Sequence, residues 1–351
     1  MSRAARAVAA GCLALLAGCQ REAQGPQARA AAWLWAQQGS DGLLHSDVYG
    51  VLRRGESLTA AALAATAQLP AALRAPHETA MRRAFAALHR SAAGDPCPGP
   101  TDYPCYTAAC HLHALALLAP PDWRAHADLR IAQLRALQFG GANGWARTDP
   151  VFGGFGLGDA PPQKPSGADH VTLSVTTAAI EALRAAGVAA DDPMLADARA
   201  FVERCQRFGG DGDDGGFCGA PGGGVLGNKG GSDAAGRPHG YGTATADGVR
   251  ALLACGSAPT SPRVRAAVAW LDAHAGDAVP GLLPEFEPSL RLYWTAALLQ
   301  TTRALGRSAA NGAFAQSRQR ADGSCRGLAG AMKEDDPVVA TTLALYGLPG
   351  H

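Results

Sequence analysis

The feature that most constrains this chain is a pattern that recurs along most of its length. A helical stretch ends in an apolar or aromatic residue and, a few residues later, a glutamine. A glycine-rich turn with an aspartate or asparagine follows, and a second helical stretch comes after it. Self-similarity of this kind is typical of repeat architectures. The clearest copies span residues 33–43, 134–145, 201–217 and 314–324.

Two further copies are more divergent, near residues 81–103 and 264–294. The first helix of a unit shows a helical apolar period, as in Val264, Ala267, Val268 and Leu271. Glycines such as Gly187 follow the second helices, where a left-handed residue closes a helix. Strand-like alternation is absent over any useful length. The sequence therefore predicts an all-α fold of about six helix pairs.

The amino-acid composition agrees with an all-α fold and excludes several classes of protein. Hydrophobic residues make up 47% and charged residues 17%, which excludes a disordered chain. The net charge is +1, and no basic stretch stands out, so nucleic acid is not an expected partner. Abundant alanine and sparse β-branched residues favour helix over strand.

The N-terminus has the pattern of an export signal. Arg3 and Arg6 precede a short apolar run that ends in Leu-Ala-Gly-Cys at 16–19, which resembles a bacterial lipobox. This predicts a signal peptide over 1–18, lipidation of Cys19 and a short tether over 19–26. The partner would be a membrane, held through the lipid, with the protein in the periplasm or at the cell surface. Gln20 in place of aspartate favours the outer membrane. The alternative is an ordinary secretory signal with a chance cysteine.

Seven of the nine cysteines follow Cys19. Export permits disulfides, but the sequence cannot define connectivity. The odd number leaves at least one thiol free, and Cys255 is a candidate. Two pairs are close in sequence and lie in or beside Gly/Pro-rich loops: Cys97 with Cys105, and Cys205 with Cys218.

The repeated unit resembles the QW-type repeat of squalene-hopene cyclases and the related repeat of protein prenyltransferase β subunits. The copy that matches most closely comprises Phe201–Gln206, the DGGF turn Asp214–Phe217 and the entry to the next helix, Tyr241–Gly248. The resemblance covers residues 27–349 and implies an α/α toroid over 27–351. Because each helix pair has two apolar faces, closing the pairs into a ring would place the second helices inside and the first outside. The glutamine would bond backbone groups of the following turn.

In that family the ring encloses an apolar cavity that binds isoprenoid chains. The resemblance implies that aromatics near turns and inner-helix starts line this cavity, and packing at the seams between repeats is the alternative. The cavity candidates are Trp145, Phe155, Phe217, Tyr241, Tyr293 and Trp294.

Class II cyclases protonate an alkene with an acid in an Asp-x-Asp-Asp-Thr pattern. The nearest match here is residues 333–337, which offers Asp335 and Asp336, and a second candidate is Asp169. Lysine replaces the first aspartate and proline the threonine, and a nearby ammonium would favour the ionised carboxylate. The alternative is that these acids cap helix N-termini.

No metal or cofactor is predicted. Cys105, Cys110, His111 and His113 are crowded, but their spacing fits no zinc template, and His111 and His113 would point to opposite sides of a helix. The Asp-rich turn at 211–215 lacks the downstream glutamate of an EF-hand. The long connections 139–168 and 207–242 are either functional or solvent-exposed insertions.

Three functions stay open. The first is an anchored toroid that binds an isoprenoid-like or other hydrophobic or extended ligand without cyclase chemistry. The second is an enzyme acting on an isoprenoid or polysaccharide, which requires a deep cavity with two facing carboxylates, one with a raised pKa. The third is a protein-interaction module, which requires a ring centre filled with side chains and an exposed apolar loop surface.

Overall fold

The computed structural model describes residues 25–92, 103–158, 160–166, 168–222, 228–276, 278–308 and 312–349. The predicted signal peptide, Cys19 and Cys97 lie outside these ranges. Within them, no helix is long and apolar enough to cross a membrane.

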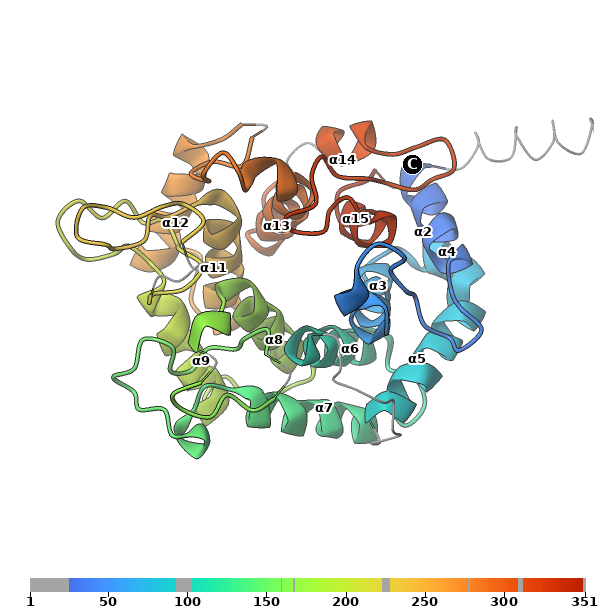
Figure 1. Cartoon of the computed structure of the whole chain (residues 1–351), viewed down its shortest axis with the longest axis horizontal. Coiled ribbons are helices and arrows are strands. Elements are labelled where there is room, and N and C mark those ends of the chain that lie inside the picture. The colour runs from blue at the N-terminus through green and yellow to red at the C-terminus, as the bar shows by residue number, and fades with distance from the viewer. Residues whose placement is uncertain are drawn as a thin grey trace, which may run out of the picture.

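Six inner helices form a closed ring (Figure 1). Each contacts the next along the chain, and the last contacts the first, so the ring has no open end. This confirms the predicted all-α toroid of six helix pairs in the described part of the chain. The inner helices are α3 (Glu56–Ala67), α6 (Pro104–Leu118), α8 (Leu173–Ala185), α11 (Gly242–Ala254), α13 (Arg291–Ala304) and α15 (Pro337–Ala344).

The outer helices cover this ring, and each precedes its inner helix in sequence. They are α2 (Pro26–Ala36), α5 (Glu78–Ala92), α7 (Trp123–Leu137), α9 (Pro193–Arg204), α12 (Pro262–Ala273) and the short α14 (Ala313–Ser317). Shorter elements are α4 (Ala71–Arg74), η1 (Gly50–Leu52), η2 (Ala75–His77), η3 (Gly141–Asn143), η4 (Ala168–His170) and η5 (Glu287–Ser289). The described residues form isolated β-bridges and no strand.

The two layers pack in a staggered way. An outer helix packs on the inner helix that precedes it, as α7 does on α6 and α12 on α11. The first outer helix, α2, packs on the last inner helix, α15. Inner helices such as α3 and α11 are buried almost all round, because the next inner helices flank them and the outer layer covers them. Their many alanines allow this close approach.

The repeated glutamines bond the turn that follows them, as predicted, and they also join neighbouring units. In each clear copy the side-chain amide donates to a carbonyl of the turn that follows and to a carbonyl in the first turn of the next outer helix. In the second copy this turn lies at 153–154, just before Phe155, and not at the predicted 143–145, because Gln138 pairs with Phe155 as Gln206 does with Phe217. The acceptors are Gly42 and Ala80 for Gln38, Gly153 and Met194 for Gln138, Gly215 and Arg263 for Gln206, and Gly323 and Pro26 for Gln319, at 2.7–3.2 Å.

In these four units a threonine of the inner helix also bonds the turn, a contact that was not predicted from the sequence. Its hydroxyl accepts from the backbone N–H of the residue after the turn, so the turn is held against the inner helix. Phe155 and Phe217, whose N–H groups are bonded in this way, are fully buried. The pairs are Leu44–Thr59, Phe155–Thr176, Phe217–Thr245 and Cys325–Thr341, at 2.8–3.0 Å.

The described cysteines carry free thiols. Cys205 and Cys218 nevertheless lie side by side, since the Cys218 N–H and thiol both donate to the Cys205 carbonyl, at 3.0 and 3.3 Å. Hydrogen bonds therefore connect the two ends of this loop in the structure. Cys255 is buried at the end of α11.

Candidate functional site: the central cavity

A cavity of about 370 Å³ lies inside the ring, and all six inner helices contribute to its wall. Most of the wall is apolar. The long connections also take part, since Leu157 belongs to 139–168 and Lys229 and Tyr241 belong to 207–242. The large apolar side chains on the wall are Leu52, Leu58, Leu157, Leu173, Leu290, Met332, Val339 and Leu343.

Tyrosine is the aromatic residue of this wall. Five of the six tyrosines in the chain line the cavity, and no phenylalanine or tryptophan of the described residues does. Four of the five lie just before an inner helix or in its first turn, and the fifth follows α15, so the rings occur near both ends of the cavity. They are Tyr103, Tyr106, Tyr241, Tyr293 and Tyr346.

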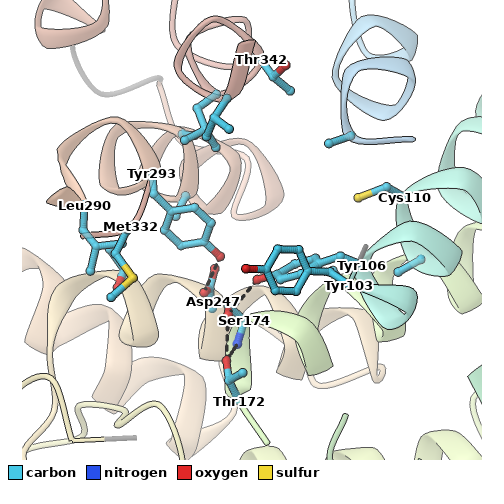
Figure 2. A pocket seen from close by; sticks show the side chains of 18 of the residues that line it. Tyr103, Tyr106, Cys110, Thr172, Ser174, Asp247, Leu290, Tyr293, Met332 and Thr342 are labelled. Atoms are coloured by element: carbon cyan, nitrogen blue, oxygen red, sulfur yellow. Dashed lines mark hydrogen bonds between the residues drawn. The ribbon is translucent and has the colours of Figure 1, made fainter. Parts of the chain in front are cut away.

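A polar cluster lies on the wall among these rings. The Tyr293 hydroxyl donates to Asp247 Oδ2 across 2.8 Å, and Arg250 Nη2 donates to Asp247 Oδ1 across 2.9 Å. Figure 2 shows Tyr293 and Asp247 meeting beside Tyr106, whose hydroxyl donates to Ser174 Oγ across 2.9 Å. These hydrogen bonds link α6 to α8 and α11 to α13.

Two carboxylates share one guanidinium in this cluster. Arg250 lies between Asp247 and Glu181, and its Nε is 3.5 Å from Glu181 Oε1. Removal from water raises the pKa of Asp247 to about 6, despite the opposing effects of Arg250 and the Tyr293 hydroxyl. Glu181 adds to the rise through charge repulsion. Asp247 and Glu181 both line the cavity, and the Arg250 guanidinium lies between their carboxylates.

Cys110 and His113 lie on the same wall, one helical turn apart on α6. Burial raises the pKa of the Cys110 thiol to about 12 and lowers that of His113, so both side chains are uncharged at neutral pH. His111 faces the other way and accepts from Arg130 Nε of α7 across 2.9 Å, as the helical spacing predicted. Among the described residues, no group of three potential ligands could hold a metal ion.

The predicted catalytic acids serve other contacts. Asp336 Oδ1 accepts from the N–H groups of Val338 and Val339, at 2.8 and 3.1 Å, and so caps α15. Asp335 Oδ1 accepts from the Tyr49 hydroxyl at 2.5 Å. Neither residue lines the cavity. Asp169 belongs to η4, and its side chain lies outside the described part of the chain.

Their neighbour Glu334 does line the cavity, but its carboxylate is also a helix cap. It accepts from the N–H groups of Leu292 and Tyr293 at the start of α13, at 2.9 and 2.7 Å. Burial raises its pKa to about 7. The acidic run in the last unit thus connects the starts of α13 and α15.

The predicted aromatics divide into two groups. Tyr241 and Tyr293 line the cavity. The other four are buried in the helical core, where Phe217, for instance, would contact any Cβ added at Gly248 of α11. Those four are Trp145, Phe155, Phe217 and Trp294.

Sequence reasoning missed Glu181, Asp247 and Arg250. A signal was available, because Asp247 and Arg250 are charged residues three apart in an otherwise apolar, small-residue helix. Such residues are rarely buried without a partner, and this spacing places them on one face.

Comparison with known proteins supports the fold. No protein-family model and no curated protein matches the sequence. Among solved structures, a protein from Actinoplanes is similar, with 18% identity and a TM-score of 0.52. The match covers 92% of this chain and 97% of that one, so the two share one architecture over nearly their whole length.

Proposed function

We propose that this protein binds an elongated, largely apolar molecule inside its ring and has no class II cyclase chemistry. The observation that carries the proposal is the cavity of about 370 Å³ with its mainly apolar wall. Protein interiors are otherwise close-packed, and ligand pockets usually span about 300–1,000 Å³. An interaction module would have a ring centre filled with side chains. The inner helices enclose a cavity instead, which favours a ligand.

The absence of cyclase chemistry is argued from the acids of the last unit. A catalytic acid must present a proton to the substrate. The oxygens of Asp336 are bonded to the start of α15 and to Ser46, and Asp335 is bonded to Tyr49, away from the cavity wall. Kinship with terpenoid cyclases and prenyltransferases is part of the proposal and rests on the repeat and the ring.

Export and lipid anchoring also belong to the proposal, and they rest on residues 1–26 of the sequence. An anchor at Cys19 would hold the ring beside a membrane, where apolar molecules are concentrated. The ligand would then be a component of the envelope.

A second candidate function has one specific observation in its favour. Asp247 and Glu181 both reach the cavity, and the pKa of Asp247 lies near 6. A carboxyl of this kind can donate and accept a proton near neutral pH, as a hydrolase or lyase requires. Turnover of a bound ligand that is lost in Asp247→Asn, with binding retained, would favour this enzyme over a simple binding protein.

The test of binding is native mass spectrometry of protein extracted gently from its own membranes. We expect a retained apolar molecule in the wild type and its loss in Ala178→Phe, because Ala178 lies on the cavity wall and a phenyl ring there fills the space. Ala185→Phe is the matched control, since Ala185 is exposed at the end of the same helix. Equal occupancy in the two variants, or none in the wild type, would contradict the proposal.

A further inference from the structure

We propose that the ligand carries an organic cation, an ammonium group attached to an apolar chain, bound by the tyrosine faces together with Asp247 and Glu181. The inference rests on the proposed function and narrows it to one class of molecule. Three independent features of the cavity carry it: the kind of aromatic residue, the count of charges and the direction of the hydroxyl groups.

The choice of aromatic residue is the first feature. Leucine and alanine already supply an apolar surface, so a purely apolar ligand would need no hydroxylated rings. This wall nevertheless has five tyrosines and, among the described residues, no phenylalanine or tryptophan. A cation is attracted to the face of an aromatic ring, and several rings around one site form an aromatic cage.

Of the cation–ring contacts among the described residues, one involves a tyrosine of the cavity wall. The Lys333 ammonium lies 5.6 Å from the centre of the Tyr103 ring and 5.7 Å from that of Tyr49. Tyr103 is therefore already occupied by a cation of the chain itself. The rings that remain for a ligand are Tyr106, Tyr241, Tyr293 and Tyr346.

The count of charges is the second feature. Asp247 and Glu181 supply two carboxylates, Arg250 supplies one positive charge, and His113 is uncharged at neutral pH. The one guanidinium contacts both carboxylates, so these three groups together carry a net charge of −1 in a largely buried site. A buried charge is costly unless it is paired, so an incoming ammonium would be stabilised here and an anion repelled.

The remaining charged groups of the wall lie elsewhere. Lys333 and Glu334 come just before α15, and Glu334 is bonded to the start of α13. Lys229 lies beside the start of α11, because a Cβ added at the adjacent Gly230 would lie 3.3 Å from the Tyr241 ring. Asp247 and Glu181 lie roughly 8 and 12 Å deeper, at 1.5 Å per helical residue. The lysines therefore lie at the helix-start end, and the group with net negative charge, Asp247, Glu181 and Arg250, lies further along the cavity.

The direction of the hydroxyl groups is the third feature. Tyr293 donates its proton to Asp247 and Tyr106 donates to Ser174. Toward a ligand these two oxygens can then only accept. Acceptors and carboxylates suit the N–H groups or positive methyl groups of an ammonium, whereas a phosphate or carboxylate would need donors.

The test uses three probes with the same eight-carbon chain: octyltrimethylammonium, octan-1-ol and octanoate. Titration calorimetry on the purified protein should show that the cation binds at least tenfold more tightly than the alcohol and that octanoate binds most weakly. Asp247→Asn and Glu181→Gln should each remove most of the preference for the cation and leave octanol affinity within about twofold. Asp272→Asn is the control, because Asp272 is an exposed acid paired with Arg307.

The contribution of the Tyr106 ring to cation binding is tested separately from that of its hydroxyl group. Tyr106→Leu should weaken binding of the cation several-fold more than binding of octanol, while Tyr106→Phe keeps the aromatic face and most of the preference. Equal affinity for the three probes, or a preference that survives both acid variants, would overturn the inference and leave the proposed function standing. Failure of all three probes to bind would overturn both.

Discussion

Gln319 donates its side-chain amide to the carbonyl of Pro26 across 2.7 Å, and so joins residues 293 apart in sequence. This bond links the last repeat to the first outer helix in the way that the other repeated glutamines link neighbouring units. It accompanies the packing of α2 on α15. The same glutamine contact that joins neighbouring units along the chain therefore also joins the last unit to the first.

Loss of such a glutamine should destabilise the whole ring. Gln206→Ala removes hydrogen bonds to Gly215 and Arg263 and leaves buried polar groups without them. We expect the free energy of unfolding to fall by about 2 kcal/mol. Urea denaturation measures it. Gln37→Ala is the control, because its amide bonds only its own helix at the surface, and an equal loss there would contradict this explanation.

A glycine in the turn permits the approach of the next outer helix. At Gly215, with φ +87°, an added Cβ would lie 2.6 Å from the Ala266 carbonyl oxygen of α12. Gly215→Ala should therefore cost roughly 3 kcal/mol through combined strain and overlap. Gly256 has the same φ with open space around it. Gly256→Ala should cost only about 1 kcal/mol, and the difference between the two variants measures the overlap.

Asp247 should make stability depend on pH. Its folded pKa of about 6 lies above the ordinary 3.8, so the folded protein binds this proton more tightly than the unfolded chain. The contribution of Asp247 to the free energy of unfolding should therefore be largest below about pH 4. It should fall as the pH rises to about 6 and then level off, with a total change of ~3 kcal/mol.

Asp247→Asn should remove that contribution. The quantity to compare is the change in unfolding free energy between pH 4 and pH 7, wild type minus variant, because other carboxyls titrate in the same range. Asp272→Asn should leave the change as it is in the wild type. A wild-type curve that rises across this interval relative to that of Asp247→Asn would refute the assignment.

Asp335 and Asp336 should differ in their effect on folding. Asp336→Ala removes the cap on α15 and the bond from Ser46, and we expect a loss of about 2 kcal/mol. Asp335→Asn should leave the fold intact, since an amide oxygen can still accept from Tyr49. Neither the wild type nor either variant should cyclise squalene. Squalene turnover by the wild type that Asp335→Asn abolishes would show that the acid motif is functional.

Much of the fold could be predicted because its signals are local. The helix, glutamine, turn and second helix are adjacent in the chain, so Gln138 and Gln206 could be assigned a role without coordinates. The residues of the candidate site were harder to predict from the sequence. Tyr241 and Tyr293 could be named from their places at helix starts, but the same reasoning also named Phe217 and Trp294, which pack in the core. Position near a turn does not determine which way a ring points.

The sequence by itself determined the number and order of the helix pairs, because apolar period, turn glycine and glutamine recur along one chain. Only the tertiary structure decided what the ring encloses. Glu181, Asp247 and Tyr293 lie on three different inner helices, and they share one cavity because each helix is rotated by its packing against two inner neighbours and an outer helix. That rotation depends on contacts between units, which no single repeat contains.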